Sequence, residues 1–205
     1  MSKVQVDTID TRSGTSTMQI GSTNTSTINI GVSGDTVNIP SGVTIANAGT
    51  ATGFGETNVN LFKAYRNGAL TLNHSTWSLV TFDTENFDVN SKYNVSDGKY
   101  TPASTGYYYL QSQVYIDFNS SNKGRRVGVR IYKNGSSIAE GFFMNNDGTD
   151  VLEELSLTIS TVDNSSSASD YYQVYAYQNN SAGANNATIV AVDTKTYFTG
   201  YKLIT

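Results

Sequence analysis

The sequence predicts an all-β protein built as a sandwich or barrel. Short segments of alternating apolar and polar residues follow one another along most of the chain, and turns rich in Asn, Gly and Ser separate them. No segment of useful length repeats its apolar residues with the period of a helix. The 205 residues are 38% hydrophobic and only 15% charged, with 14 Tyr. This composition favours strands joined by polar turns over long helices.

Composition also divides the chain into two regions. The length allows one domain of ordinary size and an accessory segment, because most domains have about 100–200 residues. Residues 1–52 are rich in Thr, Ser, Gly and Asn, whereas the Phe and Tyr residues lie in residues 53–205. We therefore expect an N-terminal segment over residues 1–52 and a head domain over residues 53–205.

A weak repeat runs through the N-terminal segment. Residues 17–21, 27–31 and 36–40 each read as a short alternating strand closed by a turn residue, about ten positions apart. One such strand buries too few side chains to offset the backbone entropy of folding, about 1–2 kcal/mol per residue. Three copies wound around a common axis could bury the apolar positions, which are Met18, Ile20, Ile28, Ile30, Val37 and Ile39. An intertwined β-repeat stalk is expected, with a flexible tether as the alternative.

The head is expected to consist of consecutive strands. They cover residues 61–65, 77–82, 107–116, 127–131, 155–159, 172–176 and 196–204. Asn134 and Gly135 follow one of them and accept the positive φ angles of a tight hairpin turn. This pair is the strongest local turn signal in the chain.

Alternation within two of these strands directs a set of tyrosines away from the core. If Tyr108 and Leu110 point inward, and Tyr172 and Val174 do so further along, their neighbours point outward. The outward residues are Tyr107, Tyr109, Tyr171, Tyr175 and Tyr177. Exposed rings are an apolar liability for a monomer, and a subunit interface covers them while each hydroxyl keeps a partner at the rim. We expect them at a trimer interface, with scattered surface tyrosines as the alternative.

An ordered set of motifs over residues 58–205 resembles the globular-head family of complement C1q and its tumour-necrosis-factor (TNF) relatives. Residues 97–110 resemble the family signature, in which a Gly-x-aromatic-x-x-Pro turn leads into Gly-x-Tyr-x-Phe. The other matches follow in the family's order: Phe62-x-Ala64, Val80-x-Phe82, Tyr93, Val129-x-Ile131, Lys133-Asn134-Gly135, Asp170-x-Tyr172-x-Val174 and Phe198-Thr199-Gly200-Tyr201. Leu110 stands where the family has Phe, and Ser169 where it has Gly. The resemblance implies a jelly-roll β-sandwich of the C1q/TNF-like type that associates as a homotrimer.

The whole chain resembles small fibre proteins of tailed bacteriophages. It combines a bare Met-Ser start, a Thr/Ser/Gly β-repeat and a C1q-like head, without a collagen repeat. The resemblance implies a tail or head fibre on the virion, attached to virion structural proteins through its N-terminus. Its head is then expected to bind a glycan or protein of the host-cell surface through loops at residues 86–95, 119–125, 145–150 and 179–186. The alternative is a purely structural capsid or tail decoration protein.

Several other partners are not expected. A net charge of −4 gives no electrostatic footprint for nucleic acid or an anionic membrane. The absence of Cys excludes disulfides, thiolate metal sites and a Cys nucleophile. No apolar run has the length of a signal peptide or of a membrane span, so we expect neither membrane insertion nor signal-directed export.

The sequence does not predict an enzyme. His74 is the only histidine and stands in a polar turn, where we expect it to be exposed, and no nucleophile-elbow pattern surrounds any Ser. The acidic residues of the segment 147–154 are glycosidase candidates only because they are acidic. The same segment is similar to a calcium loop, but Phe143 occupies the first ligand position of an EF-hand. We expect no cofactor, with calcium at a looser site as the alternative.

Overall fold

The computed structural model describes residues 20–21, 23–46, 60–118, 124–145, 152–180 and 185–203. The chain divides into two compact units, residues 1–52 and residues 53–205. The described residues form strands, turns and coil, and they contain no helix with the length and hydropathy needed to cross a membrane.

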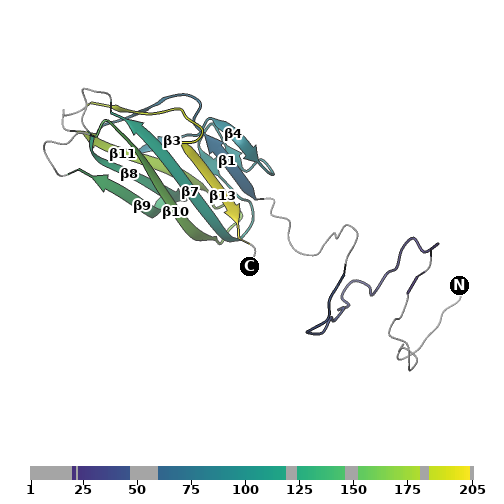
Figure 1. Cartoon of the computed structure of the whole chain (residues 1–205). Helices are drawn as coiled ribbons and strands as arrows, with labels where there is room; N and C mark the ends of the chain where they lie inside the picture. The colour runs from purple at the N-terminus through teal and green to yellow at the C-terminus, as the bar shows by residue number, and fades with distance from the viewer. Residues whose placement is uncertain are drawn as a thin grey trace. The chain divides into compact units, whose positions relative to one another are not determined.

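The head is a sandwich of two antiparallel sheets (Figure 1). The first sheet contains β1 (Leu61–Tyr65), β2 (Leu70–Leu72), β4 (Thr84–Asp88), β7 (Gly106–Asp117), β10 (Glu154–Ser165), β12 (Ala187–Ile189) and β13 (Tyr197–Lys202). The long strand β7 is central, because β10 pairs with one of its edges while β13 and then β12 pair with the other. β1 continues the sheet from β13 to β4.

The second sheet has a matching arrangement. It contains β3 (Ser78–Val80), β5 (Tyr93–Asn94), β6 (Lys99–Tyr100), β8 (Gly124–Lys133), β9 (Ser136–Met144) and β11 (Tyr172–Asn180). β8 lies between β9 and β11, and the far edge of β11 pairs with both β3 and β6. Both sheets draw strands from distant parts of the sequence, which is the jelly-roll arrangement that the motifs predict.

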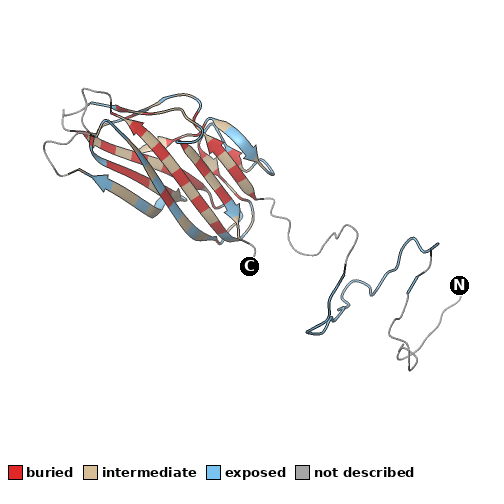
Figure 2. Cartoon of the chain, viewed as in Figure 1, coloured by how far each residue is buried: buried red, intermediate tan, exposed pale blue. Residues whose placement is uncertain are grey.

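The core lies between the two sheets, and aromatic rings fill its centre. The Phe62 ring stacks on Tyr100 at a centroid distance of 4.1 Å and meets Phe198 edge-on at 4.9 Å. Buried residues alternate with more exposed ones along the long strands (Figure 2). Most of the residues that carry the sequence resemblance are buried here, including Phe62, Ala64, Val80, Phe82, Tyr93, Tyr100, Tyr108, Leu110, Val129, Ile131, Tyr172, Val174 and Phe198.

The predicted hairpin turn is confirmed. Asn134 and Gly135 connect β8 to β9 and have φ angles of +50° and +82°. A Cβ added at Gly135 would have no atom within 4 Å, so a substitution there strains only the backbone.

Gly135→Ala is therefore expected to lower the free energy of unfolding by about 1 kcal/mol, the cost of a left-handed backbone at an L-residue. Urea denaturation measures the change. Gly141→Ala is the matched control, since a Cβ there also has open space and its φ is not left-handed. Equal losses in both variants would contradict the assignment of the cost to the turn.

The described part of the N-terminal unit shows the turns of the repeat but not its strands. Turns occur at residues 23–24, 33–34 and 41–42, and Gly21, Gly31 and Gly42 have positive φ at intervals of ten and eleven residues. Residues 20–21 and 23–46 of the single chain contain no strand, so the strands of the expected stalk stay a prediction for several copies together. A strand needs a neighbour for its N–H and C=O groups, and one copy of this repeat supplies none.

The apolar positions of the repeat are uncovered in the single chain. Ile20, Ile28, Ile30, Val37 and Ile39 are between 43% and 69% exposed. Met18, the sixth predicted stalk residue, lies outside the described residues. The geometry of one chain therefore leaves these side chains available to further copies.

Candidate binding surfaces

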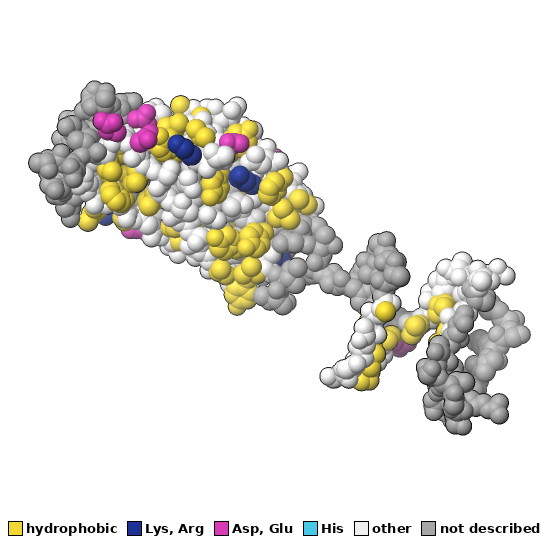
Figure 3. All heavy atoms as spheres, viewed as in Figure 1, with side chains coloured by type: hydrophobic (Ala, Val, Ile, Leu, Met, Phe, Trp, Pro, Cys, Tyr) yellow, Lys and Arg dark blue, Asp and Glu magenta, His cyan; other side chains and the backbone are white. Residues whose placement is uncertain are grey.

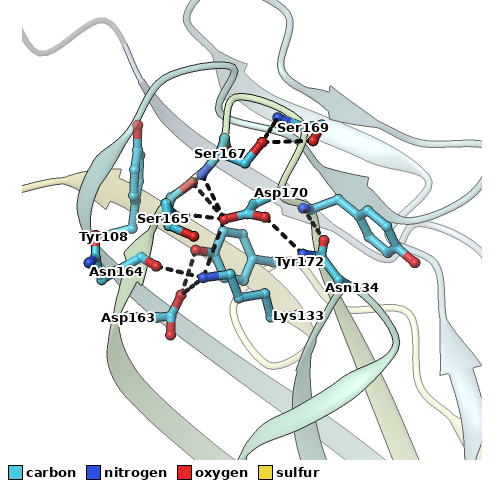
Figure 4. Close-up of polar contacts among 12 residues, drawn as sticks. Tyr108, Lys133, Asn134, Asp163, Asn164, Ser165, Ser167, Ser169, Asp170 and Tyr172 are labelled. Atoms are coloured by element: carbon cyan, nitrogen blue, oxygen red, sulfur yellow. Dashed lines mark hydrogen bonds and ion pairs between the residues drawn. The ribbon is translucent and has the colours of Figure 1, made fainter.

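A charged network holds the start of β11 in place at one end of the sandwich (Figure 4). The Lys133 Nζ lies 2.8 Å from Asp163 Oδ2 and 3.3 Å from Asp170 Oδ2. Burial by itself lowers the pKa of Lys133, but the hydrogen bonds and charges of the two carboxylates outweigh it and raise that pKa. Burial also raises the pKa of Tyr172, whose neutral hydroxyl donates to Asp163 Oδ2 at 2.8 Å.

Asp170 is the most fully bonded acid of this network. Its carboxylate accepts from Asn134 Nδ2 at 2.8 Å and from the backbone N–H groups of Ser166 and Ser167 at 2.9 and 3.1 Å. The Asn134 bond, together with Ser167 and the neighbouring ammonium group, lowers the pKa of Asp170 to about 2 although burial opposes the shift. Asn134 Oδ1 in turn accepts from the Tyr171 N–H at 3.0 Å. The network therefore joins two motifs of the resemblance, and its paired acids indicate a structural role.

The outer face of the first sheet carries a layer of tyrosines, here named the tyrosine face. It consists of Tyr107, Tyr109, Tyr115, Tyr197 and Tyr201 from β7 and β13. The Tyr109 and Tyr201 rings lie 5.3 Å apart. The Gln111 amide joins two other members of the layer, since it accepts from the Tyr109 hydroxyl at 3.2 Å and donates to the Tyr197 hydroxyl at 3.3 Å. Figure 3 shows several patches of hydrophobic side chains on one side of the head, with Lys or Arg side chains between them.

The charged groups of the tyrosine face lie away from its centre: Lys63 lies over the Tyr197 ring, Lys195 over the Tyr115 ring, and Glu154 accepts from the Tyr115 hydroxyl. The outward residues of this face on β7, β10 and β13 are Tyr109, Gln111, Gln113, Tyr115, Ser156, Thr158, Ser160, Val162, Tyr197, Thr199 and Tyr201. Val162, Tyr107 and Tyr201 are 53%, 48% and 41% exposed. A broad face with an uncharged centre and exposed apolar groups has the composition of a subunit interface.

The five tyrosines predicted at an interface occupy two separate faces. Tyr107 and Tyr109 belong to the tyrosine face, whereas Tyr175 and Tyr177 point outward from β11 in the second sheet, and Tyr171 immediately precedes that strand. Alternation shows whether a side chain faces the core, but it does not show which sheet a strand joins. The five residues therefore cannot all belong to one interface on a single face of the head. Of the five, the tyrosine face contains only Tyr107 and Tyr109.

Three further residues of the tyrosine face did not enter the predicted interface. Tyr115 continues the alternation of β7, and Tyr197 and Tyr201 alternate in the final strand. The same inward-outward rule could have found all three, once the two strands were known to be neighbours.

Three of the four predicted loops border one end of the sandwich. Asp117 pairs with Glu154 and with Thr188, so the strand ends that flank these loops lie side by side. Residues 119–123, 146–151 and 181–184 of these loops lie outside the described residues. The fourth loop begins within β4, whose Asp88 pairs with Phe62 of β1. Phe62 pairs in turn with Gly200 of β13, and Gly200 pairs with Leu110, which lies seven residues along β7 from Asp117. At about 3.3 Å per residue, that loop lies roughly 23 Å away.

The expected position of His74 needs correction. The residue is partly buried rather than exposed, its backbone forms a bridge with Gln178, and its Nδ1 has no hydrogen-bond partner among the described residues. The described residues contain no group of three His, Asp or Glu side chains that could hold a metal ion. Asp147 and Asp150 of the calcium alternative lie outside them, so that alternative stays a prediction.

Comparisons with known proteins identify the fold of the head. No family model and no curated protein matches the sequence. Among solved structures, Eiger TNF from S. frugiperda matches 72% of this chain and 94% of its own, with 12% identity and a TM-score of 0.55. Murine APRIL matches 70% of this chain and 98% of its own, with 14% identity and a TM-score of 0.51. The head therefore has the TNF-like jelly-roll fold that its sequence motifs predict.

Proposed function

We propose that the chain is a homotrimeric, non-enzymatic fibre protein of a bacteriophage virion whose head binds the surface of the host cell. Residues 1–12 attach to virion structural proteins, and the repeat that follows forms the stalk. The sequence resemblance to phage fibres supports the virion setting. The tyrosine face carries the argument for the trimer.

The trimer is best accounted for by one face of the head. A closed three-fold ring turns the same broad face of each subunit towards the axis, so that its two flanks meet the two neighbours at about 120°. Patches on opposite faces of a sandwich would instead link subunits into an open chain. The tyrosine face has ammonium groups over Tyr197 and Tyr115, from Lys63 and Lys195, but no charge at its centre. The other outer face carries Arg126, Arg130 and Glu140 on its central strands. The face with the uncharged centre costs less to desolvate and is the better interface.

The N-terminal repeat supports the same stoichiometry. Its exposed Ile and Val residues alternate with polar ones, and its turns recur at nearly constant intervals. Two further copies supply both the missing backbone partners and the cover for these side chains.

The first test is the oligomeric state of the full chain. Light scattering coupled to size exclusion is expected to give three times the mass of the monomer. A stable monomer would contradict the proposal, because the tyrosine face and the repeat would then both lie open to water.

The second test concerns host binding. Fluorescently labelled trimer is expected to adsorb to the cells of a susceptible bacterial strain in a specific and saturable manner. A trimer that adsorbs to none of a broad panel of strains would favour the decoration protein instead.

A further inference from the structure

The outer face of the second sheet carries a compact cluster of three aromatic rings. Trp77, the only tryptophan of the chain, lies 5.4 Å from the Tyr177 ring and 5.6 Å from the Phe142 ring. Phe142 and Tyr177 lie 6.2 Å apart, so each ring contacts the other two. The three come from different parts of the sheet, since Trp77 precedes β3, Phe142 is on β9 and Tyr177 is on β11. Here they are named the aromatic triad.

A glycine in the middle of β8 leaves room for the triad. Gly128 faces outward between Phe142 and Tyr177, with which it pairs in the sheet. A Cβ there would come within 2.4 Å of the Phe142 ring and 2.8 Å of Trp77. Glycine weakens a strand interior, and it commonly marks a place where another group approaches the backbone closely. The rings therefore rest on the strand at a position that any larger residue would disturb.

Two arginines flank this glycine on the same face. The guanidinium of Arg126 lies 4.0 Å from the Phe142 ring, and that of Arg130 lies 4.0 Å from the Trp77 ring. Arg130 is held by Glu140 and by the Tyr132 hydroxyl. No carboxylate among the described residues pairs with Arg126, whose guanidinium carries a planar fork of N–H donors.

The small exposed area of the triad and the polar groups beside it favour a small ligand over a protein partner. Three part-buried rings expose far less than the roughly 800 Å² per partner that a stable protein interface buries. Beside Tyr177, Asn179 Nδ2 donates to Ser75 Oγ at 2.8 Å, which adds an amide and a hydroxyl to the edge. A few polar groups around an apolar surface are typical of small-molecule sites.

We propose that the aromatic triad and Arg126 form a binding site for a saccharide that carries carboxylate groups. The C–H face of a sugar ring is apolar and slightly positive, so it packs against the negative face of an aromatic ring. Arg126 and Arg130 each cover part of Phe142 and Trp77, so the sugar packs on the ring surface that the guanidinium groups leave open. A carboxylate on the sugar pairs with the guanidinium of Arg126 in a charge-assisted, bidentate bond. This site rests on the proposed function, because a trimer would carry three copies of it. Three sites held together bind a polysaccharide surface with higher avidity than one site does.

Emission from Trp77 reports binding directly, because no other tryptophan contributes. The purified full-length trimer is titrated with short oligogalacturonates and with the same oligomers after methyl esterification. We expect a saturable change in emission with the carboxylated oligomers and at least tenfold weaker binding of the neutral esters. Equal binding of both would overturn the assignment of a carboxylate ligand, and no emission change with either would overturn the site.

Two arginine variants locate the carboxylate. Arg126→Ala is expected to weaken oligogalacturonate binding about tenfold or more, and Arg126→Lys to have a smaller effect because it keeps the charge but loses the fork. Lys99→Ala is the matched control, since it removes one positive charge from the same sheet outside the predicted loops, and its ammonium group lies over Tyr171 and not over a ring of the triad. Equal losses at the two positions would reduce the effect to net charge and contradict the site.

Adsorption to cells separates this inference from the proposed function. If Trp77→Ala and Arg126→Ala trimers adsorb to host cells as well as the parent does, the site is refuted while host binding stands. If the parent adsorbs to no strain, host binding itself is refuted. Adsorption abolished by protease treatment of the cells, but not by removal of their polysaccharide, would identify a protein receptor and contradict a saccharide ligand.

Discussion

Tyr109→Lys is expected to convert the proposed trimer into monomers. Tyr109 lies at the neutral centre of the tyrosine face, with its ring beside Tyr201 and its hydroxyl on Gln111. A lysine there would place an ammonium group in the subunit interface without an acidic partner, which costs several kcal/mol for each of the three copies. In the monomer the same lysine points to solvent, so the head itself should stay folded. Light scattering measures the mass, and circular dichroism checks the fold.

Tyr175→Lys is the matched control. Tyr175 also points outward from a central strand, but it belongs to the second sheet, where its ring packs against Tyr132 at 4.4 Å. If the tyrosine face is the interface, this variant stays trimeric. Dispersal by Tyr175→Lys with an intact Tyr109→Lys trimer would reverse the assignment of the faces.

The strand alternation in the sequence predicted the core of the head well. Burial along β7, and along β11 after the buried Gln173, follows a period of two, because each strand has one face against the other sheet and one face away from it. Tyr108 and Leu110 are buried and Tyr107 is exposed, as this pattern predicts. The hairpin at Asn134 was equally predictable, since its turn chemistry is local.

Most of the short strands could not be predicted in the same way. β2, β5, β6 and β12 have only two or three residues, too few to show a period, whereas β3 lies within the expected strand at residues 77–82. Their pairing is decided by tertiary contacts, as in β6, where Tyr100 pairs with Tyr172 across the sheet.

The surfaces were the least predictable part, because they depend on strand order. Trp77 and Phe142 lie 65 positions apart in the sequence, and only the placement of β8 between β9 and β11 brings Phe142 next to Tyr177. The single tryptophan and the glycine at position 128, between two arginines, were visible signals. Neither signal predicts an aromatic cluster until the neighbouring strands are known.

Asp170→Asn is expected to lower the free energy of unfolding by about 2–4 kcal/mol. The carboxylate accepts from Asn134 and from the two serine N–H groups, and it lies 3.3 Å from the Lys133 ammonium. An amide keeps the shape but loses the charge, and its N–H₂ group would face donors where an acceptor is needed. Chemical denaturation at neutral pH measures the loss.

The same residue predicts how stability depends on pH. The pKa of Asp170 is about 2 in the folded protein against 3.8 ordinarily, so the unfolded chain binds more protons between these values. A group with a lowered folded pKa stabilises the protein above its unfolded pKa, and this contribution is lost as pH falls from about 4 to about 2. Asp170→Asn should therefore lose less stability than the parent over that interval.

Asp97→Asn is the control, because Asp97 forms an exposed ion pair with Lys99 worth at most about 1 kcal/mol. Parallel pH profiles for the parent and Asp170→Asn would mean that the carboxylate at position 170 is not held ionised by its partners.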